Sequence, residues 1–251
     1  MILLLGGTSE TAPLALALAE AGHKVLVSTA TDIRLNTGEH PAVRRRSGRL
    51  DEPGLAALLR SEEVAVIVDA THPYAVDVRG TARRVAAQLQ LRYLAFIRPS
   101  GLQGDEDVIH ALSHDKAAHL AFGLGRPVLL TTGSRNLAPY AHAARLAGQP
   151  LVARVLDDPD SLAASRRAGL DERAVVSGRG PFSVAQNREL IRRFGIGVLV
   201  TKDSGAPGGL AAKLEAAAQE RCQVVVVDRP NLDSPPAATS IADIVRAVGP
   251  S

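Results

Sequence analysis

The sequence predicts an α/β protein built of two similar halves, each a parallel sheet flanked by helices, with a cleft between the carboxyl ends of the strands. Short runs of Val, Leu and Ile recur along the chain and are typical of strands buried on both faces. A turn rich in glycine or polar residues follows most of these runs, and a segment of helical pattern follows the turn. The same series of motifs occurs twice along the chain, which indicates an internal duplication.

The first half begins with a strand over Ile2–Leu5, a turn of sequence GGTSE and a helix over Ala12–Ala21. A strand, a glycine turn and a helix open a Rossmann-like dinucleotide-binding unit, in which amides at the helix N-terminus hold phosphate. The two glycines are adjacent instead of spaced as in G-x-G-x-x-G, so the turn by itself is a weak signal. The predicted cofactor-binding residues of this turn are Gly6, Gly7, Thr8, Ser9 and Glu10.

The second strand, Val25–Ser28, ends in the hydroxyl residues Ser28 and Thr29, and both are predicted to contact the cofactor. An NAD-selective site usually places a carboxylate at this point to bind the ribose hydroxyls, so hydroxyls alone favour NADP. Arg34 and the cluster Arg44–Arg46 are candidate partners for the additional phosphate, although a solvated basic surface explains most of these arginines as well.

A strand over Val64–Val68 carries the densest group of polar side chains in the first half. The sequence after it reads DATHPYA over residues 69–75, which supplies an acid, a hydroxyl, an imidazole and a phenol. Ligands of open α/β sheets bind at the carboxyl ends of strands, so Thr71, His72 and Tyr74 are candidate site residues. The alternative is a structural turn that only sets the direction of the next helix.

The remaining elements of the first half are a helix from about Leu50 to Arg60, a helix over Ala75–Gln88 and a strand over Arg92–Ile97, which Arg98 closes. A polar and irregular stretch, Gly101–Asp107, follows. The sequence therefore predicts a boundary that divides the chain into residues 1–104 and residues 105–251.

The second half repeats the first from the strand Val128–Leu130, whose tail TTGSR at residues 131–135 corresponds to the GGTSE turn. The next predicted elements are a strand at 151–154, a helix at 160–168 and a strand at 174–176. The loop at residues 177–183 then enters a helix over Val184–Phe194. Exposed amides at that helix start, with Arg179 beside them, would form an anion site; a tight turn with Ser183 as N-cap explains the loop equally well.

The stretch VLVTKDSGAPGGLAAK, residues 198–213, organises the second half: a strand over Val198–Thr201, then Lys202, Asp203 and Ser204, a glycine turn, and a helix to about Arg221. The chain has 29 Lys plus Arg, and only four of these residues are lysine, so a lysine here is not its usual basic residue. A charge at a strand's carboxyl end favours a ligand-binding role for Lys202, with an ordinary surface-loop lysine as the alternative.

The last predicted strand, Val224–Val227, precedes the sequence DRP at residues 228–230, which corresponds to Arg98-Pro99 of the first half. Cys222 is the only cysteine, which excludes an internal disulfide and a cysteine-based zinc site, and we expect it to pack as a small apolar residue. No metal site is expected.

The composition limits the kinds of molecule that the protein is expected to bind. The net charge is +3, aromatic residues make up 3% and Trp is absent, so a small anionic ligand is favoured over single-stranded nucleic acid. No apolar run approaches the roughly 20 residues that span a bilayer, and no signal-peptide pattern is present. These features predict a cytoplasmic protein without nucleic-acid or membrane partners, either a monomer or a weak homo-oligomer.

Five motifs together, GGTSE, DATHPYA, GRGPFS at 178–183, TKDSGAPGG at 201–209 and DRP, resemble the precorrin-6A reductases of cobalamin biosynthesis. The resemblance runs over nearly the whole chain, and DATHPYA and TKDSG are its specific parts. It implies an NADPH-dependent reduction of one carbon–carbon double bond in a tetrapyrrole-derived macrocycle, giving precorrin-6B. A sister branch of the family acts on the cobalt-containing ring, and no motif here separates the two.

The resemblance also implies roles for the candidate residues. The proton that accompanies hydride transfer would come from Lys202, Tyr74, His72 or water. Thr71 would lie beside both cofactor and substrate. The carboxylates of the ring would meet a set of polar and cationic residues, namely Thr71, His72, Tyr74, Arg98, Ser134, Arg179, Gly180, Lys202, Asp203 and Ser204.

Two other functions compete with this one. A non-catalytic nucleotide-sensing module could use the same two halves. A short-chain dehydrogenase or nucleotide-sugar epimerase would need a Tyr-x-x-x-Lys pair, and none of Tyr74, Tyr93 and Tyr140 has a lysine four residues later.

Overall fold

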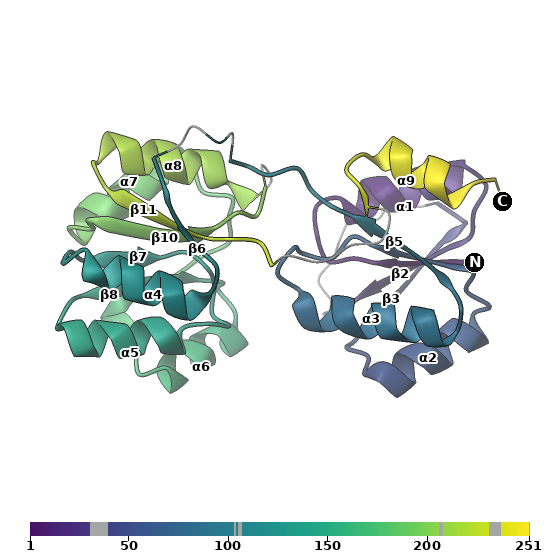
Figure 1. The fold of residues 1–251 in the computed structure, drawn as a ribbon, viewed down its shortest axis with the longest axis horizontal. Coiled ribbons are helices and arrows are strands. Elements are labelled where there is room, and N and C mark those ends of the chain that lie inside the picture. Colours follow the sequence, from purple (N-terminus) through teal and green to yellow (C-terminus); the bar gives the residue numbers. More distant parts are fainter. Residues whose placement is uncertain (31–39, 103, 105–106, 206–207, 231–236, 251) are drawn as a thin grey trace. The chain divides into compact units, whose positions relative to one another are not determined.

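A computed structural model describes residues 1–30, 40–102, 104, 107–205, 208–230 and 237–250. The chain forms two compact units, the first of Met1–Pro99 with Pro230–Ser251 and the second of Ser100–Arg229. Each unit contains one six-stranded parallel sheet with helices on both faces (Figure 1). The predicted α/β fold with two Rossmann-like halves is confirmed.

The first sheet has the strand order β12-β5-β4-β1-β2-β3. Helices α1 and α9 pack together on one face, and α2 and α3 on the other (Figure 1). Its elements are β1 (Ile2–Leu5), α1 (Thr11–Glu20), β2 (Val25–Thr29), β3 (Val43–Ser47), α2 (Glu52–Ser61), β4 (Val66–Asp69), α3 (Val76–Gln88), β5 (Arg92–Phe96), β12 (Ala237–Ala238) and α9 (Ile241–Val248).

The second sheet has the order β6-β11-β10-β7-β8-β9. Helices α4 and α5 pack together, as do α7 and α8 on the opposite face. The elements of this unit are β6 (Ile109–Ala111), α4 (His114–Gly123), β7 (Val128–Leu130), α5 (Ala138–Ala147), β8 (Leu151–Val155), α6 (Pro159–Arg167), a 3-10 turn (Glu172–Ala174), β9 (Val175–Ser177), α7 (Val184–Arg193), β10 (Val198–Lys202), α8 (Leu210–Gln219) and β11 (Gln223–Val227).

The two sheets repeat one topology. Strands β7 to β11 stand in the same spatial order as β1 to β5, as an internal duplication requires. The sixth strand of each sheet, however, comes from the segment that follows the fifth strand of the other sheet. Strand β6 follows β5 in sequence but pairs with β11, whereas β12 follows β11 but pairs with β5.

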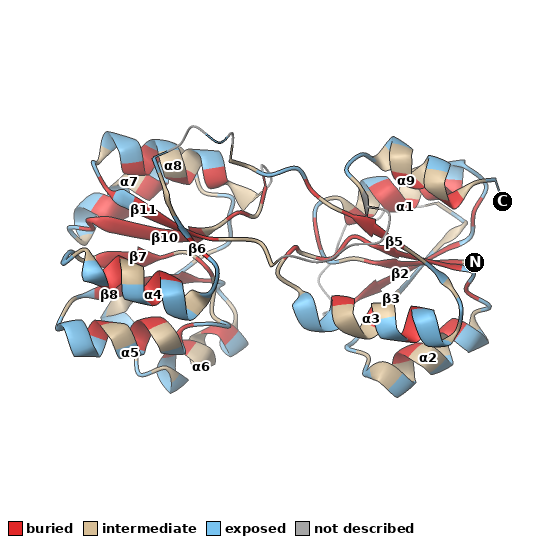
Figure 2. Ribbon diagram, in the orientation of Figure 1, coloured by how far each residue is buried: buried red, intermediate tan, exposed pale blue. Residues whose placement is uncertain are grey.

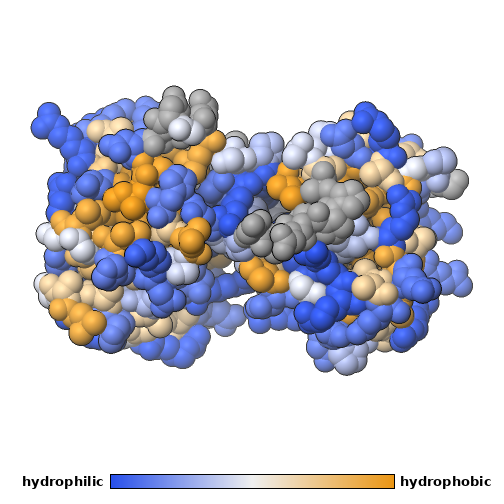
Figure 3. All heavy atoms as spheres, viewed as in Figure 1, coloured by the Kyte–Doolittle hydropathy of each residue, from blue (hydrophilic) through white to orange (hydrophobic). Residues whose placement is uncertain are grey.

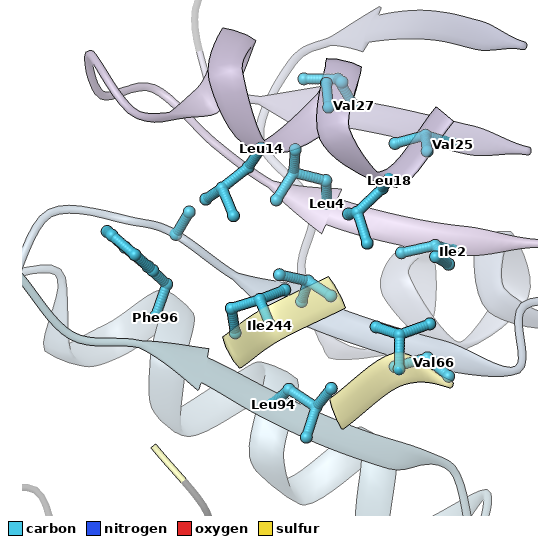
Figure 4. Packing of buried hydrophobic residues seen from close by; sticks show 14 residues of the cluster. Ile2, Leu4, Leu14, Leu18, Val25, Val27, Val66, Leu94, Phe96 and Ile244 are labelled. Atoms are coloured by element: carbon cyan, nitrogen blue, oxygen red, sulfur yellow. The ribbon is translucent and has the colours of Figure 1, made fainter. Parts of the chain in front are cut away.

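Apolar clusters on both faces of each sheet hold the helices in place, and the strands are the most deeply buried segments (Figure 2). In the first unit, Ile244 of α9 has no exposed surface and points into the cluster formed by Leu4, Leu14 and Val66 (Figure 4). Cys222 packs in an apolar cluster of the second unit, as expected. Hydrophilic residues cover much of the face seen in Figure 3, with smaller apolar patches between them.

Two stretches of the chain belong to a different unit from the one that the predicted domain boundary assigns. Residues 230–251 were expected in the C-terminal half, but β12 and α9 complete the sheet and the core of the first unit. Ser100 and Gly101 were expected in the N-terminal half, but both donate hydrogen bonds to the carboxylate of Asp203 and belong to the second unit. These long-range contacts leave no local signal in the sequence.

Candidate functional site

The GGTSE turn lies at the carboxyl end of β1, the central strand of the first sheet. Gly6 is required because a Cβ there would lie 2.4 Å from Cγ2 of Thr11, and Gly7 because its φ is +111°. The amides of Gly7 and Thr8 both donate to Oγ1 of Thr11, at 3.0 and 3.1 Å. Thr11, which stands near the place of the last glycine in G-x-G-x-x-G, therefore fixes the turn with its hydroxyl.

A second contact joins this turn to the DATHPYA segment. The Thr8 hydroxyl donates a hydrogen bond of 2.9 Å to the carbonyl oxygen of Ala70. Strands β1 and β4 are neighbours, with Leu5 opposite Asp69. Two segments that the sequence marks as separate candidates therefore lie together at one edge of the first sheet.

The side chain of Asp69 holds the DATHPYA segment in place. Its buried carboxylate accepts hydrogen bonds from the amide and hydroxyl of Thr71, at 2.9 and 2.6 Å, and from the hydroxyl of Tyr93. Arg79 of α3 lies 3.3 Å from the same carboxylate and also donates to the Thr71 hydroxyl and carbonyl. Burial and the adjacent carboxylate raise the pKa of Tyr93, which keeps its hydroxyl a donor. Sequence reasoning missed both partners: Tyr93 lies on the next strand, and Arg79 lies in the helix that follows the motif, where one arginine of several gives no separate signal.

His72 and Tyr74 stand together at this edge. Their ring centroids are 5.6 Å apart, and the Tyr74 amide donates to Nδ1 of His72 at 3.4 Å. Both side chains are half-buried. An imidazole and a phenol this close are suited to bind and orient a ligand or to transfer a proton.

Arg98 and Glu10, predicted to bind substrate and cofactor respectively, form an ion pair with each other inside the first unit. The Arg98 side chain is buried. Its guanidinium therefore ties the end of β5 to the start of α1.

At the end of β2, Ser28 and Thr29 are buried, and the Ser28 hydroxyl accepts a hydrogen bond of 2.7 Å from Nη1 of Arg46. Arg46 lies opposite Ser28 on the edge strand β3. Of the arginines proposed as phosphate partners, Arg46 thus lies beside the Ser28 hydroxyl, while Arg34 lies outside the described residues.

In the second unit, the TKDSG segment is held through Asp203. This buried carboxylate accepts hydrogen bonds from the Gly101 amide and the Ser100 hydroxyl, both at 2.9 Å, and pairs with Arg229 at 2.8 Å. Burial alone would raise the pKa of Asp203, but these hydrogen bonds and the Arg229 charge outweigh burial and lower it. Ser204 packs against Gly208, where a Cβ would lie 2.3 Å from the Ser204 Cβ.

Lys202 directly precedes Asp203, but the groups that shift its pKa are different. Burial, aided by the positive charge of Arg135, lowers the pKa of Lys202 to about 8. Burial and the Lys202 charge likewise lower the pKa of His114 to about 4, and Nδ1 of His114 lies 2.9 Å from the hydroxyl of the fully buried Tyr140. A lysine with this pKa can hold a carboxylate or exchange a proton near neutrality. The sequence carried no signal for His114.

The other second-unit candidates divide into two groups. Arg179 and Gly180 are exposed on the loop before α7. Ser183 caps that helix, accepting a hydrogen bond from the Gln186 amide at 3.2 Å, as the tight-turn alternative expects. Ser134 is half-buried with its hydroxyl 3.0 Å from that of Ser161. The predicted cleft between the carboxyl ends of the strands stays a prediction.

The described residues contain no group of three or more His, Cys, Asp or Glu side chains arranged to hold a metal ion. None of the helices within the described ranges is both long and apolar enough to cross a membrane.

Two parallel sheets of one topology, the first with a glycine turn after its central strand, define a protein of the Rossmann-like dinucleotide-binding class. The family model "Precorrin-6x reductase CbiJ/CobK" matches residues 1–249, and the chain belongs to this family of oxidoreductases. The resemblance stated from the five motifs is thereby confirmed.

Named relatives cover both branches of the family. The precorrin-6A reductase of Mycobacterium tuberculosis H37Rv is 36% identical over 245 residues, covering 97% of this chain and 93% of the relative. The cobalt-precorrin-6A reductase of Priestia megaterium is 29% identical over 249 residues, covering 99% and 98%. A solved structure of CobK precorrin-6A reductase is similar with a TM-score of 0.78 and 26% identity, covering 98% of this chain and 95% of that one.

Proposed function

We propose that this protein is a precorrin-6A reductase that uses NADPH to reduce one carbon–carbon double bond of the macrocycle, giving precorrin-6B. Family membership supports the reaction class and, with it, a nicotinamide cofactor. The observation that carries the assignment is the hydrogen bond of 2.9 Å between Thr8 and Ala70. It brings a dinucleotide-type glycine turn to the same sheet edge as the polar DATHPYA segment.

The first unit fits a dinucleotide. Among the described residues, no atom beyond the adjacent ones lies within 4 Å of a Cβ built on Gly7, so this side of the turn is open to a phosphate. At the end of β2, Arg46 and Ser28 offer a guanidinium and a hydroxyl where the adenosine ribose of a dinucleotide lies in this fold. A guanidinium here supports NADPH over NADH, because it pairs with the additional phosphate.

When bound, the nicotinamide supplies the hydride. The protein must hold the ring near it, neutralise the carboxylates of the ring and provide a proton for the neighbouring carbon. His72, Tyr74 and Lys202 are the proposed donors. Lys202, with its pKa near 8, is largely protonated at neutral pH and is equally suited to bind a carboxylate.

The test is turnover by the purified full-length protein. We expect oxidation of NADPH when precorrin-6A is added, with a product whose mass is higher by two hydrogens. The cobalt-containing ring belongs in a parallel assay, because a relative named for that substrate matches 99% of this chain. Binding of NADPH without oxidation in the presence of either ring would contradict the proposal and favour a sensor.

A further inference from the structure

The duplication allows the two units to be compared residue by residue. Strand β1 begins at Ile2, opposite Val25 and Val66, and strand β7 begins at Val128, opposite Leu151 and Val198. Counting from these partners, Ser28 of the first unit corresponds to Arg154 of the second. Asp69 of the first unit corresponds in the same way to Thr201.

By this correspondence, the second unit keeps a cation in the helix after the strand but has a threonine, Thr201, where the first unit has the carboxylate of Asp69. In the first unit, Arg79 of the helix after β4 pairs with Asp69 at 3.3 Å. In the second unit, Lys213 of the helix after β10 reaches the corresponding position and meets Thr201 instead. Its Nζ lies 3.4 Å from the Thr201 hydroxyl and 3.2 Å from the carbonyl oxygen of Gly208, and the residue is 9% exposed.

Arg154 adds a second buried positive charge. It is 7% exposed, and its Nη2 atom is buried without a hydrogen-bond partner among the residues that the structure describes. The guanidinium lies 4.1 Å from the centre of the Phe182 ring. Burial lowers the pKa of Arg154 to about 10, and burial together with the charges of Arg154 and Lys202 lowers that of Lys213 to about 8.

No carboxylate among the described residues lies within ion-pair distance of Arg154 or Lys213. Removing a cation from water is costly unless an opposite charge compensates it. Arg154 and Lys213 are both buried and close enough for their charges to interact, so without such a charge they are unfavourable in the ligand-free protein. An anionic ligand that placed its charge between them would remove this cost.

The loop at residues 178–183 covers Arg154 and reaches the start of α8, the helix that carries Lys213. Gly178 and Gly180 lie against the Phe182 ring, where a Cβ would come within 3.1 and 3.3 Å of ring atoms. Pro181 contacts the start of α8, with its Cβ 3.4 Å from the Cβ position of Gly209. The half-buried Phe182 side chain thus separates Arg154 from solvent, and glycines on both sides leave room for the ring.

We propose that Arg154 and Lys213 form an anion-binding site of the second unit that takes a carboxylate side chain of the tetrapyrrole substrate beneath the Phe182 ring. The inference rests on the proposed function for the identity of the ligand. A phosphate of the dinucleotide has the same charge but is assigned to the first unit, where the GGTSE turn lies.

The experiment measures ligand affinity and thermal stability in the full-length protein with Arg154→Met and, separately, Lys213→Met. The probes are a polycarboxylate porphyrin, followed by its fluorescence, and NADPH, followed by calorimetry. Arg193→Met is the matched control, because the Arg193 guanidinium also lies over an aromatic ring, 5.1 Å from Phe194, but is exposed.

We expect each of the two variants to bind the porphyrin about tenfold or more weakly, as for the loss of one charged hydrogen bond. NADPH affinity should not change, and the melting temperature should stay or rise, because an unpaired buried charge has been removed. Arg193→Met should bind both probes as the original protein does.

Unchanged porphyrin affinity in both variants would overturn the inference, and so would a loss confined to NADPH. Failure of both variants to fold would also overturn it, since the cations would then serve the fold. Porphyrin binding does not require turnover. A protein that turns over precorrin-6A but whose variants bind normally would therefore contradict this inference alone and leave the proposed function standing.

Discussion

Arg229, two residues after β11, lies 2.8 Å from the carboxylate of Asp203, the residue that follows β10, and also donates to its carbonyl oxygen at 3.0 Å. The ion pair joins the DRP and TKDSG motifs, which are far apart in sequence. With Ser100 and Gly101 on the same carboxylate, three segments of the second unit converge on one buried side chain. Asp203 thus sets the position of Lys202.

We expect Asp203→Asn to lower the free energy of unfolding by about 1–3 kcal/mol, because buried donors lose a charged acceptor. The folded-state pKa of Asp203 is below its unfolded value of about 3.9, so its stabilising effect is present above that pH and is lost as the pH falls through the folded pKa. Denaturant unfolding between neutral and acid pH should show a shallower acid loss in the variant. Glu172→Gln, which changes an exposed carboxylate, is the control. If stability fell equally with acid pH in Asp203→Asn and in the original protein, Asp203 would not be the source of this pH dependence.

For Lys202, we expect Lys202→Ala to weaken binding of the ring about 10- to 150-fold, the range for one charged hydrogen bond. NADPH affinity and thermal stability should barely change. Binding and steady-state kinetics measured together separate the roles, since loss of a proton donor would lower turnover with the ring still tightly bound. A variant with normal binding and turnover would show that the stretch is only a structural turn.

The lowered pKa of Lys202 predicts that the affinity for the ring depends on pH. Its ammonium charge is lost as the pH rises through about 8, so ring affinity should fall over that range. Lys202→Arg stays charged and should bind the ring with a flatter pH profile. Parallel profiles in the two proteins would contradict a role for the Lys202 charge.

At the GGTSE turn, we expect Gly7→Val to abolish NADPH binding in a folded protein. The new side chain would point into the open space where the pyrophosphate is proposed to lie, and the φ of +111° would add backbone strain that the control variant shares. Gly133→Val is the matched control, because Gly133 has a φ of +86° and an equally open Cβ position but lies in the second unit. Unchanged NADPH binding in Gly7→Val would place the phosphates elsewhere.

For the choice of cofactor, we expect Arg46→Ala to weaken NADPH binding about tenfold or more while NADH binding stays as it is, because only NADPH offers a phosphate to the guanidinium. Arg44→Ala, which breaks an exposed pair with Glu62, should change neither affinity. Equal losses for both nucleotides would argue against the 2′-phosphate as the partner of Arg46.

The sequence predicted the fold where hydrophobic runs are continuous. Strands Ile2–Leu5 and Val128–Leu130 have the expected bounds, and the motifs follow the strands as expected. Strand β3 was missed because three consecutive arginines, Arg44–Arg46, hide it. An edge strand accepts such charges, since one side of it faces solvent.

The motifs identified residues of the candidate site, but they did not show which side chains contact one another. The motifs identify Asp69 and Asp203 as positions at strand ends, yet their partners Tyr93, Arg79 and Arg229 come from other elements. Arg98, a predicted substrate-binding residue, pairs with Glu10, a predicted cofactor-binding residue, and the motifs did not indicate this pair. Motifs in a single sequence do not reveal which charges meet, because that depends on the strand order, which the motifs do not show.

The exchanged edge strands have a consequence for synthesis on the ribosome. The first unit lacks its sixth strand and the helix bearing Ile244 until the final part of the chain has been translated. The second unit, by contrast, is a continuous stretch, Ser100–Arg229, with all its strands available earlier. The half that is made first therefore finishes folding last, and until then it exposes an open sheet edge beside β5 that is able to pair with other chains.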